Sequence, residues 1–315
     1  MKLKILVTGG GGSATEALYK IWKKKYDLYF CDCNIIKKPV SIPPKKWIKV
    51  PLASSKNYIK VLKKVITLYK INLLIPAVDE EVDIISKKRK EFNCDLLMPS
   101  HEFINIHKNK WSTNRFLENN KLNFPKSLIL KKNTKLFTGP LVIKPMMGRG
   151  SKGVRIIDQK KGIERYISKS DRSGKMMIQR KVIGQEYTVM VSSNKKGVVK
   201  AIVPVKVIEK KGITILGKTE KNSHVINECF KIHNKFQTPG CYNIQLILDK
   251  KKKVYTFEIN PRISTTSCLA IYAGIDIVHI FMNNNPIKNQ KKDLKKFKEN
   301  ILLSRSWINS FSVIK

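Results

Sequence analysis

Acidic residues are scarce in this sequence, which carries 23 Asp and Glu against 63 Lys and Arg and a formal net charge of +40. An excess of this size usually points to a nucleic-acid partner. Only nine of the basic residues are Arg, however, the lysines are spread along the whole chain, and no nucleic-acid motif with interleaved aromatic residues is present. We therefore expect no specific nucleic-acid partner, and only non-specific adsorption to polyanions at low salt.

Long apolar runs and paired cysteine motifs are also missing. No run of about 18 apolar residues occurs, and the first apolar segment, residues 5–7, ends at glycines. The sequence predicts neither a membrane span nor a signal peptide, and hence a cytoplasmic protein with no membrane partner. The six cysteines lack CxxC spacing, which favours reduced, structural thiols. The 315 residues, 42% of them hydrophobic, suffice for two domains or one large one.

The chain opens on a short apolar strand that runs into the glycines at 9–12 and then into a helix over about residues 13–25. A second strand over 29–32 ends at Asp32. This Rossmann-like order lets backbone amides at a helix N-terminus hold an anion, although a tight turn with no ligand fits equally well. A nicotinamide reductase is not favoured, because the Tyr19-x-x-x-Lys23 pattern lies inside the first helix.

Strand and helix patterns continue to alternate as far as about residue 105. A helix is expected over 55–70, and strands over 71–76 and 96–99. The acidic residues at 79–83 begin another helix. We expect their negative charges to interact favourably with the helix dipole and not to bind a metal. This alternation predicts a parallel sheet flanked by helices.

A second glycine-rich segment, residues 146–154, follows an apolar strand over 140–145 that contains Lys144. Its three glycines let backbone amides approach an oxyanion, while Lys144 and Lys152 add positive charge. It is not a Walker A loop, because a strand and not a helix follows it. A plain hairpin tip is the alternative interpretation. Two further strands are predicted over 176–179 and 185–191.

The strongest local signal lies at 254–266, where alternation predicts a strand that Pro261 ends. Glu258 and Asn260 would share one strand face, with Arg262 just beyond. Two hard oxygen donors and a bidentate cation at a strand end suit Mg²⁺ and a phosphate group. A solvated polar face is the plainer alternative.

The preceding strand, residues 241–249, sets the partner of Glu258. With a four-residue loop over 250–253, residue 249 would pair with residue 254, and Gln245 would then lie opposite Glu258. Simple alternation also places Phe257 with Ile259 on the buried face, and Thr256 with Glu258 on the other.

The order and spacing of these segments resemble the ATP-grasp family, in its carbamoyl-phosphate-synthase-like branch. The segments concerned are Asn-Lys-Trp-Ser-Thr at 109–113, Val-Ile-Lys-Pro at 142–145, the 146–154 loop, the two strands that follow it, and Glu-Ile-Asn-Pro-Arg at 258–262. The resemblance implies an α/β fold, α+β in its second part. It divides the chain into a Rossmann-like pre-ATP-grasp domain over 1–105, an ATP-grasp domain over 106–283 and a C-terminal tail over 284–315.

The resemblance also assigns site residues. The lysines that contact the nucleotide phosphates are Lys110 and Lys144, and Lys218 is a loosely placed further phosphate contact. The loop that covers the phosphates contributes Gly148, Gly150, Ser151 and Gly153. The adenine hinge includes Gln179, Arg180 and Val182, and Glu186 is the acid that holds the ribose hydroxyls. The metal ligands are Gln245, Glu258 and Asn260, and the catalytic residues are Arg262 and Lys144. The chain departs from the family at Asn109 and Gln179, where acids are frequent, and at Gln245, where ligases outside this branch have a carboxylate.

The activity implied by the resemblance is the ATP-dependent ligation of a small-molecule carboxylate to an amine through an acylphosphate, giving ADP and phosphate. ATP and Mg²⁺ would be required, with a second ion or Mn²⁺ as variants, and a homodimer is one assembly to expect. A carbamoyl-phosphate-type kinase acting on bicarbonate or carbamate is less favoured, because the 315 residues hold a single ATP-grasp unit and no glutaminase. A non-catalytic ATP-binding module is less favoured because both lysines and all three metal-ligand types are present. No motif identifies the acceptor.

Overall fold

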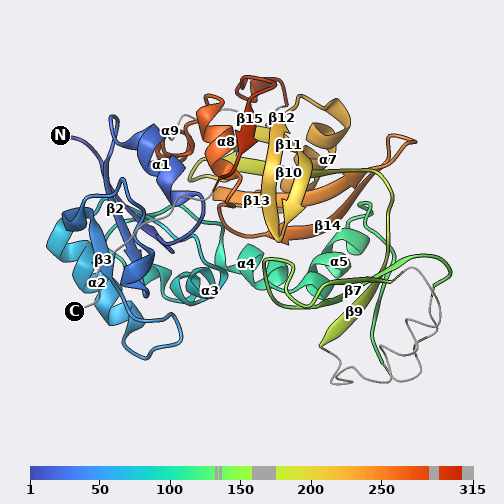
Figure 1. Ribbon diagram of the computed structural model, residues 1–315, viewed down its shortest axis with the longest axis horizontal. Helices are drawn as coiled ribbons and strands as arrows, with labels where there is room; N and C mark the ends of the chain where they lie inside the picture. Colours follow the sequence, from blue (N-terminus) through green and yellow to red (C-terminus); the bar gives the residue numbers. More distant parts are fainter. Residues whose placement is uncertain (132–133, 135–136, 158–174, 284–290, 307–315) are drawn as a thin grey trace.

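The computed structural model describes residues 1–131, 134, 137–157, 175–283 and 291–306. Three sheets organise these residues, and Figure 1 shows them arranged along the long axis of the molecule. A parallel sheet lies at one end, a six-stranded antiparallel sheet in the middle, and a small antiparallel sheet at the other end. The predicted α/β fold, with a Rossmann-like parallel sheet followed by an α+β part built on antiparallel sheets, is confirmed.

The N-terminal sheet is fully parallel and has the order β3-β2-β1-β4-β5. Its strands are β1 (Lys4–Thr8), β2 (Asp27–Asp32), β3 (Trp47–Lys49), β4 (Leu73–Ile75) and β5 (Asp95–Leu96). Its helices are α1 (Thr15–Trp22), α2 (Tyr58–Tyr69), α3 (Asp79–Lys87) and α4 (His101–His107). Strand β3 was not predicted, because three half-exposed residues carry too little apolar pattern.

The six-stranded sheet has the order β14-β13-β10-β11-β12-β15. Its strands are β10 (Gln185–Ser193), β11 (Val199–Lys211), β12 (Ile213–Thr219), β13 (Gly240–Leu248), β14 (Val254–Asn260) and β15 (Leu302–Ser304). Helix α7 (Ser223–Asn234) packs on one face of this sheet through Val225, Cys229 and Ile232. Strand β15 lies in the segment that was expected to be a tail and pairs with β12.

The third sheet has the order β6-β9-β7-β8 and holds the predicted glycine-rich hairpin. Its strands are β6 (Ser127–Ile129), β7 (Leu141–Pro145), β8 (Arg155–Ile157) and β9 (Met176–Arg180). Helix α5 (Lys110–Asn119) runs between the larger sheets and this one, and it packs against β14.

The β13–β14 hairpin pairs Gln245 with Glu258, as predicted, but the route to that register differs. Leu248 pairs with Val254, so the connecting loop has one residue more than expected and shifts the register by one. A bulge between the pairs Leu246–Thr256 and Gln245–Glu258 then shifts it back. The two shifts cancel.

The same bulge makes the predicted face assignment of β14 wrong. Thr256 is fully buried, whereas Phe257 is only partly buried. Val254 and Ile259 lie in one core cluster although they are five positions apart, which simple alternation does not allow. The extra residue, Phe257, is therefore displaced toward the face that carries Glu258, where Lys144 and Lys210 lie over its ring.

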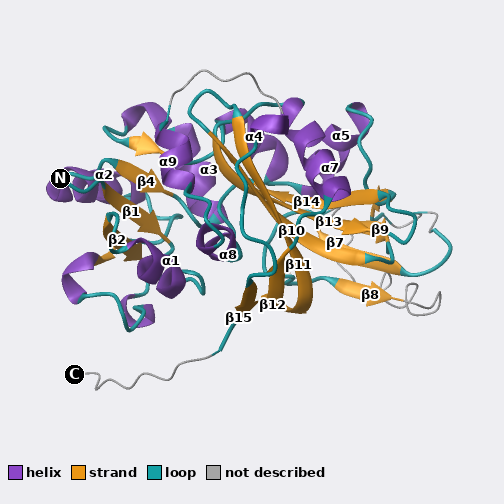
Figure 2. Cartoon of the chain, turned by 90° about the horizontal axis from the view of Figure 1, so that it is seen from above, coloured by secondary structure: helices purple, strands orange, loops and turns teal. Residues whose placement is uncertain are grey.

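One hydrophobic core joins the parallel sheet to the six-stranded sheet. It contains Ile5 and Phe30 from the first sheet together with Met190 and Cys241 from the second. Helices α8 (Ser267–Tyr272) and α9 (Ile277–Met282) contribute to this core, and Figure 2 shows them between the two sheets. Within the described residues, no helix is both long and apolar enough to cross a membrane.

Candidate functional site

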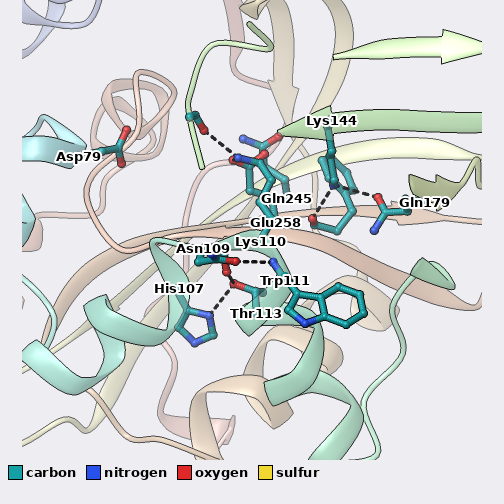
Figure 3. Close-up of polar contacts among 12 residues, drawn as sticks. Asp79, His107, Asn109, Lys110, Trp111, Thr113, Lys144, Gln179, Gln245 and Glu258 are labelled. Carbon is teal, nitrogen blue, oxygen red and sulfur yellow. Dashed lines mark hydrogen bonds and ion pairs between the residues drawn. The ribbon is translucent and has the colours of Figure 1, made fainter. Parts of the chain in front are cut away.

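Lys110 connects helix α5 to the glycine-rich loop and to β14. The Asn109 side chain caps α5 by accepting the amides of Trp111 and Ser112 at 2.8 and 3.2 Å, which fixes the first turn. Lys110 Nζ then reaches Glu258 Oε1 at 3.3 Å and donates to the carbonyl oxygen of Gly148 at 2.7 Å (Figure 3). Asn109, at a position where the family often has Asp, therefore still caps the helix.

Lys144 is almost completely buried on β7. Its Nζ donates to Gln179 Oε1 at 2.9 Å and to the carbonyl oxygen of Phe257 at 3.2 Å. Burial lowers the pKa of Lys144 to about 8, with Glu258 acting against that shift and Lys110 and Lys210 adding to it. This buried ammonium group has two neutral acceptors and forms no ion pair with a carboxylate of the described residues, so it is suited to binding an anionic ligand.

The three predicted metal ligands lie together on one face of the β13–β14 hairpin. Gln245 pairs with Glu258 across the strands, and Asn260 is two positions further along. Asn260 is buried yet lines the large cavity described below. A carboxylate and two carboxamide oxygens are hard donors that fit Mg²⁺ when phosphate oxygens complete the shell. Figure 3 shows Gln245 and Glu258 beside Lys110.

Two further polar residues of this region were not predicted as site residues. Asn243 pairs with Asn260 in the hairpin and accepts a hydrogen bond from Thr188, while its buried Nδ2 has no partner among the described residues. Lys210 lies 2.5 Å from Glu186 Oε1 and 3.4 Å from Gln245 Oε1. Alternation with Gln245 could have indicated Asn243, but only the pairing of β11 in the sheet brings Lys210 here.

The glycine-rich loop over 146–154 adopts left-handed backbone conformations at several predicted positions. Gly148, Gly150, Ser151 and Gly153 all have positive φ. A Cβ at Gly148 or Gly150 would meet no backbone atom within 4 Å, so space does not require glycine there, whereas the backbone conformation favours it. Arg149 anchors the loop to helix α3 through an ion pair with Glu80 at 3.4 Å.

The predicted adenine hinge begins in the last two residues of β9. Gln179 is buried, and its Nε2 donates to Ser127 Oγ at 3.0 Å. The amide of Arg180 donates to the carbonyl oxygen of Lys126 and the amide of Lys181 to that of Pro140, at 2.8 and 3.0 Å. Of the three backbone amides over 180–182, these two are therefore engaged within the protein.

Two other predicted residues have polar partners that were not predicted as site residues. Arg262 makes a bidentate ion pair with Asp79, at 2.8 and 3.0 Å, and so connects β14 to the first turn of α3. Lys218 lies on β12 with its Nζ 3.2 Å from Asn300 Oδ1. The acidic start of α3 therefore has a specific partner, in addition to any effect on the helix dipole.

A cavity of about 960 Å³ lies between the N-terminal glycines and the β13–β14 hairpin. Its lining includes Lys110, Gly148, Glu258 and Asn260. It also includes Gly9, Gly11 and Gly12, together with Asp32 and residues of α3. The volume is in the range of about 300–1,000 Å³ that is usual for small-molecule pockets.

Comparisons with known proteins bear on this arrangement. Residues 107–266, half of the chain, match the family described as an ATP-grasp domain. No curated protein sequence matches the chain. Among solved structures, the L-amino acid ligase from Bacillus licheniformis is 16% identical with a TM-score of 0.67, and the alignment covers 88% of this chain and 72% of that one.

Two other solved structures are similar to the same extent. The N5-carboxyaminoimidazole synthetase from Staphylococcus aureus, complexed with ADP, is 13% identical with a TM-score of 0.68, covering 87% of this chain and 74% of that one. The biotin carboxylase from Campylobacter jejuni is 14% identical with a TM-score of 0.67, covering 96% and 74%. At these identities the likeness concerns the fold. With its three sheets, its glycine-rich hairpin and the match over 107–266, the chain belongs to the ATP-grasp family.

Proposed function

We propose that this protein is an ATP-dependent carboxylate–amine ligase that works through an acylphosphate and releases ADP and phosphate. The observation that carries the proposal is the meeting of Lys110, Lys144 and the Gln245–Glu258 pair beside a cavity of small-molecule size. The L-amino acid ligase of similar fold supports it. Within the family, the sequence motifs resemble those of the carbamoyl-phosphate-synthase-like branch.

In the first step, a substrate carboxylate oxygen attacks the γ-phosphorus of ATP and the bond to the β–γ bridging oxygen breaks, giving an acylphosphate and ADP. Lys110 and Lys144 would stabilise the phosphate charge during this transfer. In the second step, a neutral amine attacks the acyl carbon, the bond to the phosphate oxygen breaks, and the nitrogen loses a proton. No protein nucleophile is needed.

Gln245, Glu258 and Asn260 would hold Mg²⁺, which supplies neutralisation of the triphosphate charge. Glu186 would accept hydrogen bonds from the ribose hydroxyls of the nucleotide, and its ion pair with Lys210 would keep the carboxylate oriented. The loop over 146–154 would shield the acylphosphate from water. The 3.3 Å contact between Lys110 and Glu258 balances the charge of this carboxylate before the nucleotide binds.

Arg262 was predicted to face the transferred phosphoryl group. Its bidentate pair with Asp79 is compatible with that role only if the guanidinium shares or exchanges this partner when substrate binds. We therefore propose Arg262 as a residue that couples α3 to the site, and Lys144 as the better supported contact to the phosphoryl group.

The test is ADP release with MgATP and a panel of carboxylates and amines, each amine offered with each carboxylate. A ligase releases ADP only when an acceptor carboxylate is present, and an amide product accumulates with it. Bicarbonate as the sole effective acceptor would instead identify the carbamoyl-phosphate-type activity. ATP binding without ADP release under every combination would identify a non-catalytic module.

The lowered pKa of Lys144 predicts a pH dependence of nucleotide binding. A phosphate group favours the ammonium form, so a site whose free pKa is about 8 must take up a proton when MgATP binds above that pH. We expect affinity to fall by up to about tenfold per pH unit above about pH 8. Calorimetry at about pH 9, in two buffers of different ionisation enthalpy, measures the uptake. Lys144→Met should abolish it, and a wild-type protein without uptake would contradict the prediction.

The net charge of +40 predicts non-specific binding to duplex DNA. We expect the affinity to be independent of base sequence and to fall by about 10-fold or more between roughly 50 and 200 mM salt. Fluorescence anisotropy with two duplexes of unrelated sequence, titrated at both salt concentrations, measures this. Tight binding to one of the duplexes alone at the higher salt would show that the lysines form a specific nucleic-acid surface.

A further inference from the structure

Lys210 reaches the proposed nucleotide site through an irregularity of strand β11. Thr188 on β10 pairs with Val205 on one side and with Gln245 on the other, so these three side chains share one face of the sheet. Regular alternation from Val205 would place Lys210 on the opposite face. The β11–β12 register shifts twice between Val207 and Lys210, and Lys210 Nζ instead lies 3.4 Å from Gln245 Oε1. The irregular pairing therefore turns this lysine toward the site.

The ammonium group of Lys210 connects polar groups of two neighbouring strands. Its Nζ lies 2.5 Å from Glu186 Oε1 on β10 and 3.4 Å from Gln245 Oε1 on β13. An ammonium group has three N–H donors, and the third has no acceptor among the described residues. The side chain is 27% exposed, so a ligand can still reach this donor.

Lys210 also lies near the other two lysines of the site. Its Nζ is 5.7 Å from the centroid of the Phe257 ring, and Lys144 Nζ is 5.4 Å from the same centroid. The bulge in β14 that displaces Phe257 thus brings its ring to both lysines. The charge of Lys210, like that of Lys110, adds to the lowering of the Lys144 pKa that burial causes. Three ammonium groups therefore gather beside the proposed metal ligands.

The charges of this cluster favour an anion before any metal binds. Lys110, Lys144 and Lys210 bring three positive charges, whereas Glu186 and Glu258 bring two negative ones. Lys110 and Lys210 each have one of these carboxylates as a partner, and the acceptors of Lys144 are neutral. A partly desolvated site with an excess of ammonium groups is suited to a phosphate group.

The order of the groups on the sheet indicates which phosphate Lys210 would contact. Glu186 pairs with Ile247, two positions from Gln245 on β13, and Gln245 pairs with Glu258. Glu186 is the proposed ribose acceptor, and the other two are proposed ligands of the metal that binds the terminal phosphates. Lys210 Nζ lies between Glu186 and Gln245. Because the α-phosphate joins the ribose to the terminal phosphates, a nucleotide held at both ends would have its α-phosphate at Lys210.

We propose that Lys210 is a third nucleotide-binding lysine, which contacts the α-phosphate. The inference rests on the proposed function, because it uses the placement of the ribose at Glu186 and of the metal at Gln245 and Glu258. A contact with the α-phosphate needs neither Mg²⁺ nor a terminal phosphate, so it should act on AMP as well as on ATP. A lysine that only orients Glu186 would serve the ribose, and would act on adenosine and AMP alike.

The test compares AMP with adenosine, which differ only in this phosphate, by ligand-observed NMR titration with EDTA present. Salt at about 0.15 M screens long-range attraction to the basic surface. We expect the wild-type protein to bind AMP about tenfold or more tightly than adenosine. Lys210→Met should weaken AMP by about tenfold and change adenosine by less than about twofold. Lys211→Met is the matched control, because Lys211 is exposed on the same strand and pairs with Glu209, and it should keep both wild-type affinities.

Two further variants distinguish Lys210 from its neighbours, with circular dichroism to check that each protein is folded. Glu186→Gln should weaken adenosine without lowering the preference for AMP, because it removes the ribose acceptor and leaves the Lys210 ammonium group free. Lys144→Met should keep most of that preference, because Lys144 is proposed to contact the transferred phosphoryl group. Equal weakening of AMP and adenosine in Lys210→Met would show that Lys210 acts only through Glu186. Loss of the AMP preference in Lys144→Met and not in Lys210→Met would place the α-phosphate at Lys144, and either result overturns the proposal.

The binding test and the ADP-release test can fail separately. If no acceptor supports ADP release and Lys210→Met still loses the preference for AMP, the assignment of Lys210 stands and the ligase falls. If ADP is released while the wild-type protein binds AMP no more tightly than adenosine, the ligase stands and the assignment of Lys210 falls. A wild-type protein that binds neither AMP nor adenosine would also overturn the assignment.

Discussion

Replacing Glu258 with Gln should lower ADP release by about 100-fold or more, which corresponds to roughly 2.7 kcal/mol of barrier. Glu258 carries the sole formal negative charge of the three proposed metal ligands, and it lies 3.3 Å from Lys110. The nucleotide should still bind, because the lysines and the hinge are retained. The largest loss should come where charge moves onto the leaving and attacking oxygens, so turnover should fall far more than affinity.

The measurement is ADP production with saturating MgATP and the acceptor panel, alongside calorimetric binding of MgATP. Circular dichroism checks that the variant is folded. Glu209→Gln is the matched control, because it removes one carboxylate from an exposed position of the same sheet, where Glu209 pairs with Lys211. Wild-type turnover in a folded Glu258→Gln protein would show that β14 does not carry the metal site.

Lys144→Met should weaken MgATP binding by about 30-fold or more, or roughly 2 kcal/mol. The lysine is buried between Gln179 and the Phe257 backbone, so its ammonium group depends on a ligand for a negative partner of its own. Methionine keeps much of the side-chain length and removes only the charge and the donors. The loss should therefore reflect the phosphate contact and not a cavity in β7.

Calorimetry with MgATP and with MgADP distinguishes a phosphate contact from a general weakening. Lys175→Met is the matched control, because Lys175 is exposed directly before β9. Both proteins should keep the wild-type far-ultraviolet circular dichroism spectrum. If Lys144→Met binds MgATP as tightly as Lys175→Met does, the buried lysine is a structural residue, and the phosphate contact must be sought at Lys110 or Lys210.

Part of the candidate site could be predicted because it depends on local spacing. Glu258 and Asn260 are two residues apart on a strand, so any strand places them on one face. Lys110 follows an Asn that caps a helix, and Lys144 lies in a strand before a glycine loop. The partner of Glu258 was also predicted correctly, although the prediction missed two register shifts. One comes from a longer loop and the other from a bulge at Phe257, and the two cancel.

The sequence by itself determined the parallel sheet, the glycine-rich hairpin and the set of oxygen and lysine side chains on β14, α5 and β7, because periodicity and turn residues act over a few positions. Only the tertiary structure decided that Arg262 pairs with Asp79, 183 residues away, and that Lys210 meets Glu186. It also decided that the first glycines turn their amides inward, leaving Asp32 and Glu81 at the cavity wall. These contacts depend on how sheets pack on one another, and a local pattern carries no information about distant partners.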